Sequence, residues 1–257
     1  MKAAFAVLAL VVAAGAVALG FGYQPGTSNV LMSGVEARPL PGGKVAVFLT
    51  VETSGTPDRI VSVESPAGRA SLADAPQSGL PLPLGMSSLA PDAAHVIIDV
   101  ADPDQTLDGA LLPLTLALAE AGKVSVRARV ADPAVMGQAH RMGLFGIGDI
   151  CVVGDGEPAP AIELEVEPEG DGWQVQIVTE EFTFSRDLTG LYHVPGMGHG
   201  HLYVGGMKIS RLYESVAVIG ALPPGEHEIR VTLNTNDHRA YVVNDVPVTA
   251  SATITVD

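Results

Sequence analysis

The chain has 257 residues, of which 47% are hydrophobic, and it contains 29 Gly and 19 Pro. This composition argues against long helices and favours many short strands joined by turns. The 14 Lys and Arg stand against 29 Asp and Glu, a net charge of −15. A nucleic-acid partner is therefore excluded, because phosphate binding requires clustered cations. An acidic surface instead raises the local concentration of cations.

The N-terminus has the pattern of a secretory signal peptide. Lys2 is followed by an uncharged run over residues 3–21 and then by polar, turn-forming residues, and Ala18-Leu19-Gly20, with small residues at its first and third positions, suits a cleavage site. The run is also long enough to span a bilayer if it is not removed. We expect residues 1–22 to be a signal peptide or a membrane anchor, with cleavage favoured. The protein is then periplasmic or exported, or is held at the inner membrane.

Residues 30–131 predict a first β-domain. The run 111–122 has helical propensity, but Pro113 and the strand-like segment after it favour a strand. Gly- and Pro-containing turns separate the expected strands. These strands are the runs KVAVFLTVET (44–53), DRIVSVESP (58–66), HVIIDV (95–100), LLPLTLALAEAG (111–122) and KVSVRARV (123–130).

A second β-domain is predicted over residues 161–257, after a Gly- and Pro-rich linker over 132–160. Two alternating runs flank Gly170-Asp171-Gly172, which is a hairpin signal, and Gly205-Gly206 marks another turn. Short strands at this spacing predict a sandwich. The expected fold class is all-β, with two antiparallel Greek-key β-sandwich domains of the cupredoxin-like or immunoglobulin-like kind.

Cys151 is the only cysteine, so no intramolecular disulfide can form. The fifteen residues after it, VVGDGEPAPAIELEV, contain no His or Met. A blue-copper site needs both close to its thiolate. We interpret Cys151 as a small buried hydrophobic residue.

The first block resembles the periplasmic copper chaperone family PCu(A)C. The resemblance rests on the ordered segments KVAVFLTVET, PDRIVSVESPAGRASL, HVIIDV and LLPLTLALAEAGKVSVRARV. It covers about 100 residues and implies a β-sandwich domain in an exported protein. In that family, His and Met residues on and near these strands bind copper.

Most of the copper ligands of that family are missing here. Ala73 and Ala75 stand where the first His and its nearby Met are expected, and Ile97 replaces the second sulfur ligand of the later strand. His95 is kept, and Met86 has no secure counterpart. Side chains without imidazole or thioether cannot bind Cu(I). We therefore interpret His95 as structural and keep it only as a weak metal candidate.

The second block contains the stretch YHVPGMGHGHLYVGG over residues 192–206. His199 and His201 are two positions apart on a predicted strand, so both imidazoles point to one face, about 6.5–7 Å apart along the chain. Gly200 between them eases close approach of another backbone. Two imidazoles on one face predict half of a metal site, to be completed from a neighbouring strand or loop.

His238, in TLNTNDHRAY, is the candidate third ligand, and Asp237 could orient an imidazole as a hydrogen-bond acceptor. Met197 could add a soft axial ligand. The competing interpretation is that these imidazoles make ordinary hydrogen bonds, as we expect for His227 in PGEHEIRV. Weaker metal candidates are His193, Met207 and, in the linker, His140 and Met142.

The second block also resembles, more loosely, the small exported β-sandwich domains of the CopC and YtkA-like kind. Imidazole with thioether is a donor set for copper, which we favour over zinc. No Gly-x-Ser-x-Gly elbow, phosphate loop or zinc-protease motif is present in the sequence. We expect a copper chaperone or copper-homeostasis factor rather than an enzyme, with a periplasmic or membrane acceptor protein. Two alternatives remain, a non-metal envelope interaction module and a zinc hydrolase.

Overall fold

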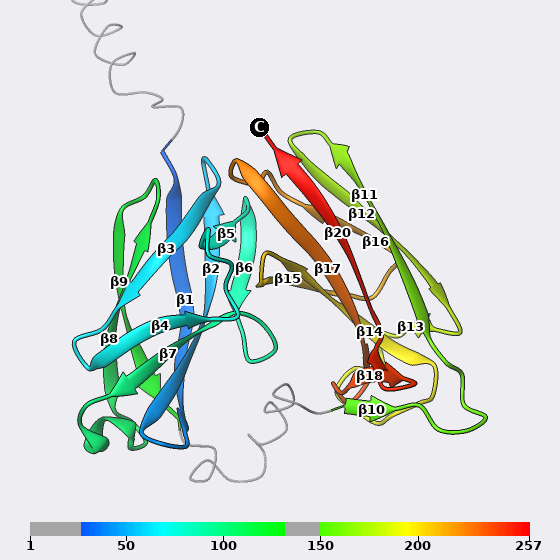
Figure 1. Cartoon of the computed structure of the whole chain (residues 1–257), viewed down its shortest axis with the longest axis horizontal. Coiled ribbons are helices and arrows are strands. Elements are labelled where there is room, and N and C mark those ends of the chain that lie inside the picture. The colour runs from blue at the N-terminus through cyan, green and yellow to red at the C-terminus, as the bar shows by residue number, and fades with distance from the viewer. Residues whose placement is uncertain (1–26, 132–149) are drawn as a thin grey trace, which may run out of the picture.

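The computed structural model describes residues 27–131 and 150–257, which form two β-rich domains side by side (Figure 1). Within these ranges there is no α-helix, and the single helical element is the short 3-10 helix η1, Pro103–Thr106. No helix in the described part of the chain is long and apolar enough to cross a membrane. The leader expected at residues 1–22 lies outside the described residues, as do His140 and Met142.

The first domain contains nine strands. Five of them, β2, β3, β7, β8 and β9, lie where the sequence predicted strands, including the strand over residues 111–118 for which a helix was the alternative, and the other four were not predicted. The strands are β1 (Asn29–Leu40), β2 (Lys44–Ser54), β3 (Asp58–Glu64), β4 (Gly68–Ala73), β5 (Leu80–Leu82), β6 (Gly85–Leu89), β7 (His95–Val100), β8 (Leu111–Leu118) and β9 (Lys123–Val130).

The long strand β2 organises this domain. It pairs with β1 along one edge, while its other edge pairs with β7 in its first half and with β6 in its second half. All pairs are antiparallel except β1 with β9. Alternating residues such as Val45, Val47 and Leu49 point inward and are at most 2% exposed. They pack against Leu112, Leu114 and Leu116 of β8 in one apolar core.

The second domain contains eleven strands. They are β10 (Ile150–Val152), β11 (Ala161–Glu169), β12 (Gly172–Glu180), β13 (Thr183–Phe184), β14 (Met197–Val204), β15 (Met207–Leu212), β16 (Val216–Ile219), β17 (Gly225–Thr235), β18 (Ala240–Val243), β19 (Val246–Pro247) and β20 (Thr249–Val256). The hairpin turn at 170–171 and the Gly205-Gly206 turn fall where the sequence predicted them. Strand β10 lies within the expected linker and pairs with β18, so residues 150–152 form part of this domain's sheet.

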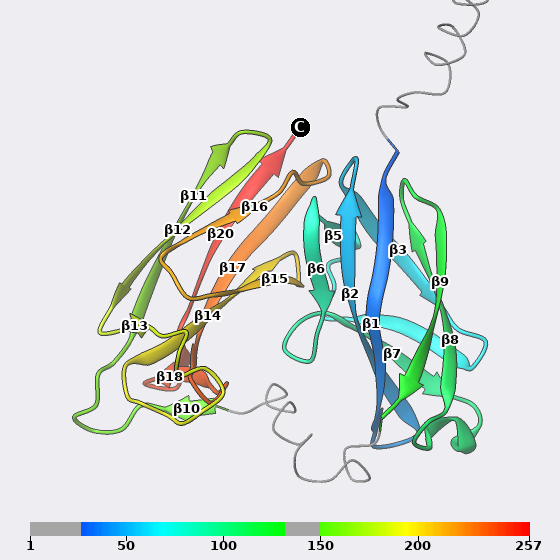
Figure 2. The same cartoon turned by 180° about the vertical axis from the view of Figure 1, so that it is seen from behind.

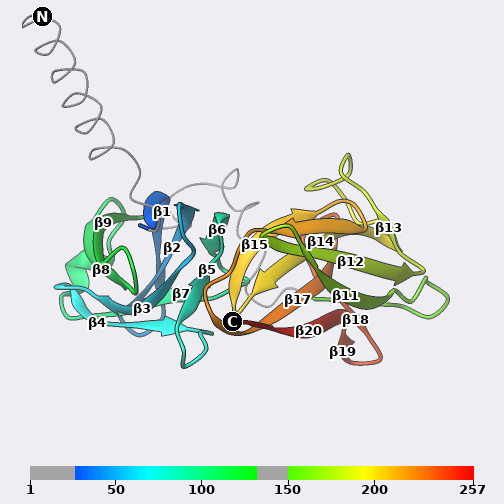
Figure 3. The ribbon, with the colours of Figure 1, turned by 90° about the horizontal axis from the view of Figure 1, so that it is seen from above.

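Two sheets face each other in the second domain. One contains β11, β12 and β16, and the other is centred on β14 and β17 (Figure 3). Val175 and Ile177 of β12 meet Leu202 of β14 and Val231 of β17 in the core between them. Together with the first domain, this confirms the all-β class with antiparallel β-sandwich layers.

The two domains are joined by backbone as well as by side chains. Strand β15 runs beside β6, where Lys208 pairs with Ser88 (Figures 1 and 2). The amide of Ala94 donates to the carbonyl of Gly206 at 2.8 Å, and the amide of Leu84 donates to the carbonyl of Ala221 at 2.9 Å. The interface therefore fixes the loop between β6 and β7 against the turn between β14 and β15.

Candidate functional site

Strand β14 is buried on both faces, so its imidazoles lie inside the protein. Leu202 and Val204 face the core between the sheets. His199, His201 and Tyr203 alternate with them and point to the opposite face, as the two-residue period of a strand requires. The exposure of His199 is 0% and that of His201 is 3%. A strand with this pattern carries its polar groups into an enclosed space, where they need partners.

Gly200 lies where β14 packs closely against the core between the two sheets. A β-carbon at this position would lie 3.1 Å from Cβ of Leu212 and 3.4 Å from a methyl group of Val231. We expect Gly200→Ala to lower the free energy of unfolding by about 1–3 kcal/mol, because it overpacks the core beneath the imidazoles. Urea unfolding measures this, with Gly154→Ala in an exposed loop as the matched control. Equal stability of the two variants would contradict the packing described here.

The structure brings together the three imidazoles that the sequence singled out. Nε2 of His199 lies 3.0 Å from Nε2 of His201. The ring of His238 has its centroid 4.7 Å from that of His199 and 6.4 Å from that of His201. His238 follows β17 in a turn with a φ of 69°, and β17 pairs with β14 so that Asn234 faces His199. The strand pairing is therefore what carries His238 to the other two rings.

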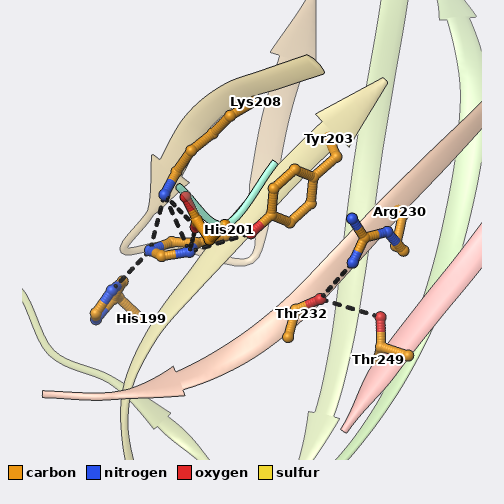
Figure 4. A network of polar contacts seen from close by, with 8 residues as sticks. His199, His201, Tyr203, Lys208, Arg230, Thr232 and Thr249 are labelled. Atoms are coloured by element: carbon orange, nitrogen blue, oxygen red, sulfur yellow. Dashed lines mark hydrogen bonds and ion pairs between the residues drawn. The ribbon is translucent and has the colours of Figure 1, made fainter. Parts of the chain in front are cut away.

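His201 is held by a group from the first domain. Its Nδ1 lies 2.7 Å from Oδ2 of Asp92, in the loop between β6 and β7. The same oxygen accepts from the ammonium of Lys208 at 2.6 Å and from the hydroxyl of Tyr203 at 2.9 Å. Figure 4 shows His199 and Tyr203 on opposite sides of the His201 ring, with the Lys208 ammonium above it. A single carboxylate thus fixes the orientation of this imidazole.

Burial keeps these imidazoles neutral. It lowers the pKa of His199 to about 2, with a further contribution from the neighbouring His201 and His238. Burial also lowers the pKa of His201 to about 4, although the hydrogen bond to Asp92 opposes this. The pKa of His238 is lowered by burial as well. At neutral pH each ring therefore has a nitrogen lone pair, which is the form that binds metals.

Asp92 remains ionised although it is partly buried. Burial alone would raise its pKa, but the hydrogen bond from His201 and the charge of Lys208 hold the pKa well below its usual range. Burial lowers the pKa of Lys208, while Asp92 opposes that shift. The pair therefore consists of a carboxylate and an ammonium, beside a neutral His201 whose Nδ1–H donates to the carboxylate.

The donor set fits a metal ion in type, but the rings are not yet in a metal-binding arrangement. Two nitrogens that both bind one ion at about 2 Å lie a little over 3 Å apart, close to the separation of the His199 and His201 nitrogens. Within residues 27–131 and 150–257, however, no group of three or more His, Cys, Asp or Glu is already positioned to hold a metal. His238 must turn toward the other two rings, and the Lys208 ammonium, 3.4 Å from Nε2 of His201, must move aside.

The remaining predicted residues lie elsewhere or have other partners. Asp237 was expected to orient an imidazole, but Arg239, two residues away, pairs with it at 3.1 Å, so the orienting carboxylate is Asp92. Met207 is fully buried in the apolar core of the first domain. Met197 begins β14 and lines a surface hollow with Glu181 and Phe182.

His193 lies apart from the three rings. Its Nε2 is 3.9 Å from Sγ of Cys151, and its ring packs near Tyr241. Cys151 is buried in an apolar cluster with Leu233 and Tyr241, as expected for a small hydrophobic residue. His227 is also structural, because its Nε2 is 2.7 Å from the carbonyl of Pro223.

In the first domain, the strand pairing shows why the family's copper site is not reproduced. His95 on β7 lies directly opposite Ala73 on β4, and Ile97 lies opposite Ser71. Nδ1 of His95 is 2.9 Å from the carbonyl oxygen of Ala93. The imidazole therefore has a local backbone partner and faces a side chain that cannot bind a metal.

Sequence reasoning missed Asp92 and Lys208. Asp92 lies in the loop LAPDAAH, whose composition indicates only a turn. It reaches His201, more than a hundred residues away, only because the two domains dock. No local pattern in the sequence reports such a contact.

Residues 29–130 match the model of a family described as "Putative lipoprotein LpqE-like". Similar solved structures include "Copper-bound PCuAC domain from PmoF2", which is 27% identical and covers 43% of this chain and 97% of that chain, with a TM-score of 0.37. "Apo PCuAC domain from PmoF1" is 26% identical and covers 43% of this chain and 98% of that chain, with a TM-score of 0.35. The first domain thus resembles PCu(A)C domains. The likeness of the second domain to CopC and YtkA-like domains stays a loose resemblance. A comparison with curated proteins finds no match.

Proposed function

We propose that this protein is an exported copper-binding protein that carries copper as its cargo at His199, His201 and His238. The observation that carries the proposal is the approach of the His199 and His201 nitrogens to 3.0 Å, with the His238 ring next to them. Two buried imidazoles on β14 and a half-buried one in the turn after β17, all neutral, are a costly arrangement, and a bound metal ion would satisfy their lone pairs.

Imidazole suits copper and zinc alike, so the choice between them rests on the surroundings of the site. The similarity of the first domain to copper-chaperone domains supports copper. The description of the matching family as a "Putative lipoprotein" supports export. Met197, two positions before His199 on β14, would add a soft ligand for Cu(I) if its side chain turns toward the rings. The cargo would pass to a periplasmic or membrane acceptor protein, and no catalytic step is proposed.

Equilibrium dialysis of the wild-type protein against Cu(I), Cu(II) and Zn(II) tests the proposal. We expect about one copper ion per chain, with a dissociation constant below about 1 μM and with copper bound more tightly than zinc. Copper binding no tighter than micromolar would overturn the proposal. Tighter binding of zinc than of copper would mean that the cargo is zinc.

A second candidate function is a non-metal interaction module of the cell envelope. The observation that favours it is the first domain's lack of copper ligands, since Ala73 lies opposite His95. A pull-down with the wild-type protein separates the two functions. Recovery of the same partner with and without a chelator favours the interaction module, whereas recovery that depends on copper favours the cargo protein.

A further inference from the structure

We propose that docking of the first domain completes the metal site of the second, so that copper binding and domain docking stabilise each other. This inference rests on the proposed function and assigns a positioning role to Asp92. Asp92 binds no metal in this account. It acts through His201, whose Nδ1 lies 2.7 Å from its carboxylate oxygen across the domain interface.

The loop that carries Asp92 is held by backbone hydrogen bonds, one within the loop and one across the domain interface. Within the loop, the amide of Ala90 donates to the carbonyl of Ala94 at 3.2 Å. Across the interface, the amide of Ala94 donates to the carbonyl of Gly206 at 2.8 Å, in the turn that joins β14 to β15. The carboxylate is therefore positioned by the docked backbone and follows the first domain if that domain moves away.

The contact selects one protonation form of His201. A proton on Nδ1 is needed to donate to Asp92, which leaves the lone pair of the neutral ring on Nε2. That nitrogen is the one facing His199. Carboxylates that accept from the second nitrogen of a metal-binding imidazole fix its orientation and raise its basicity. Without Asp92, the ring is free to rotate and to carry its proton on either nitrogen.

Lys208 already pairs with the Asp92 carboxylate as a cation. Its ammonium lies 2.6 Å from Asp92 and 3.1 Å from Nδ1 of His201, and it supplies the positive charge that balances the buried carboxylate. A bound copper ion would bring its own positive charge to the same imidazole. The negative charge of Asp92 then stabilises the copper ion. The Lys208 ammonium can move away because its side chain is flexible.

The first test replaces Asp92 and measures copper affinity in the full chain. Asp92→Asn keeps the shape of the side chain and removes the charge, and Asp99→Asn, at an exposed position of β7, is the matched control. We expect Asp92→Asn to weaken copper binding by roughly 10- to 100-fold, with Asp99→Asn unchanged. If the wild type itself does not bind copper, the proposed function fails. If the wild type binds copper and Asp92→Asn has an affinity within roughly threefold of the wild type, only the present inference fails. A change that small lies below the expected loss of roughly 10- to 100-fold.

The second test disturbs docking at a distance from the imidazoles. A β-carbon on Gly220 would overlap the carbonyl oxygen of Leu84 across the interface. Gly220→Ala should therefore loosen docking and weaken copper binding, although it changes no group at the site. By reciprocity, copper should slow amide hydrogen exchange at Leu84 and Ala94 in the wild type. Unchanged affinity in Gly220→Ala with a loosened interface, or exchange that copper does not alter, would overturn the linkage.

Discussion

Replacing His199 and His201 together by alanine is expected to weaken copper binding by more than about 100-fold, because loss of a residue that merely orients a ligand already costs 10- to 100-fold. Both imidazoles are buried, and their nitrogens face one another at 3.0 Å. A single remaining ring, that of His238, cannot hold the ion against water and buffer. Competition titrations with a copper chelator of known affinity measure the change.

The control for this experiment is His95→Ala, which removes an imidazole from the first domain. His95 has a backbone partner and faces Ala73, so copper affinity should not change. Because alanine leaves a cavity in place of two buried rings, His199→Gln with His201→Gln is a second variant that keeps more of the volume. Copper binding that survives in both double variants would place the ion elsewhere.

Acid is expected to destabilise the metal-free protein more steeply than its carboxylates alone would. His199 has a pKa of about 2 in the folded protein and His201 of about 4, against an ordinary value of 6.5. Above pH 6.5 both are neutral in the folded and unfolded states, so they contribute nothing to the pH dependence. Below pH 6.5 both histidines become protonated in the unfolded chain but stay neutral in the folded chain. The free energy of unfolding therefore falls as pH falls.

The slope is about 1.4 kcal/mol per pH unit for each such histidine, hence roughly 2–3 kcal/mol per unit for both between about pH 6 and pH 4. The lowered pKa of Asp92 acts at more acidic pH, because its stabilising effect is lost only below about pH 4. The two contributions therefore separate along the pH axis.

Urea unfolding at several pH values in the presence of a chelator measures this slope. The single tryptophan, Trp173 on β12, packs against the core of the second domain and reports its unfolding. His199→Gln with His201→Gln should flatten the slope between pH 6 and pH 4. An equal slope in this variant and in the wild type would show that the imidazoles are protonated, and hence hydrated, in the folded protein.

Strand periodicity made the shared face of His199 and His201 predictable. In β14 every second residue points the same way, and Gly198 and Gly200, on either side of His199, allow the close packing observed. His238 could be proposed by residue type alone, and the antiparallel pairing of β14 with β17 is what places it. Local sequence patterns therefore predicted that His199 and His201 share a face, whereas the position of the His238 ring depends on strand pairing.

The orienting carboxylate could not be predicted, for two physical reasons. Asp237 is adjacent to His238 in sequence, but it pairs with Arg239, because oppositely charged neighbours in a turn meet at little cost in ordering the chain. Asp92 comes from another domain, and its contact depends on the docking of two surfaces whose complementarity has no short sequence signal. The same docking buries Met207 in the core of the first domain and removes it from the ligand candidates.

The arrangement also gives a role to the first domain, which resembles copper-chaperone domains but lacks most of their copper-binding side chains. The first domain offers Ala73, Ala75 and Ile97 where that family has metal-binding side chains. Its remaining contribution is Asp92, which it presents to an imidazole of the second domain. In this account the first domain supports the site in the second domain and binds no copper itself.

X-ray absorption spectroscopy at the copper edge, on the wild-type protein loaded with one equivalent of copper, tests the central claim most directly. The account predicts a first coordination shell dominated by imidazole nitrogens at about 2 Å, with the outer-shell scattering of at least two histidine rings. That scattering should be lost in the variant lacking His199 and His201. A first shell dominated by sulfur at about 2.3 Å, or one made of water and carboxylate oxygens without imidazole scattering, would contradict it.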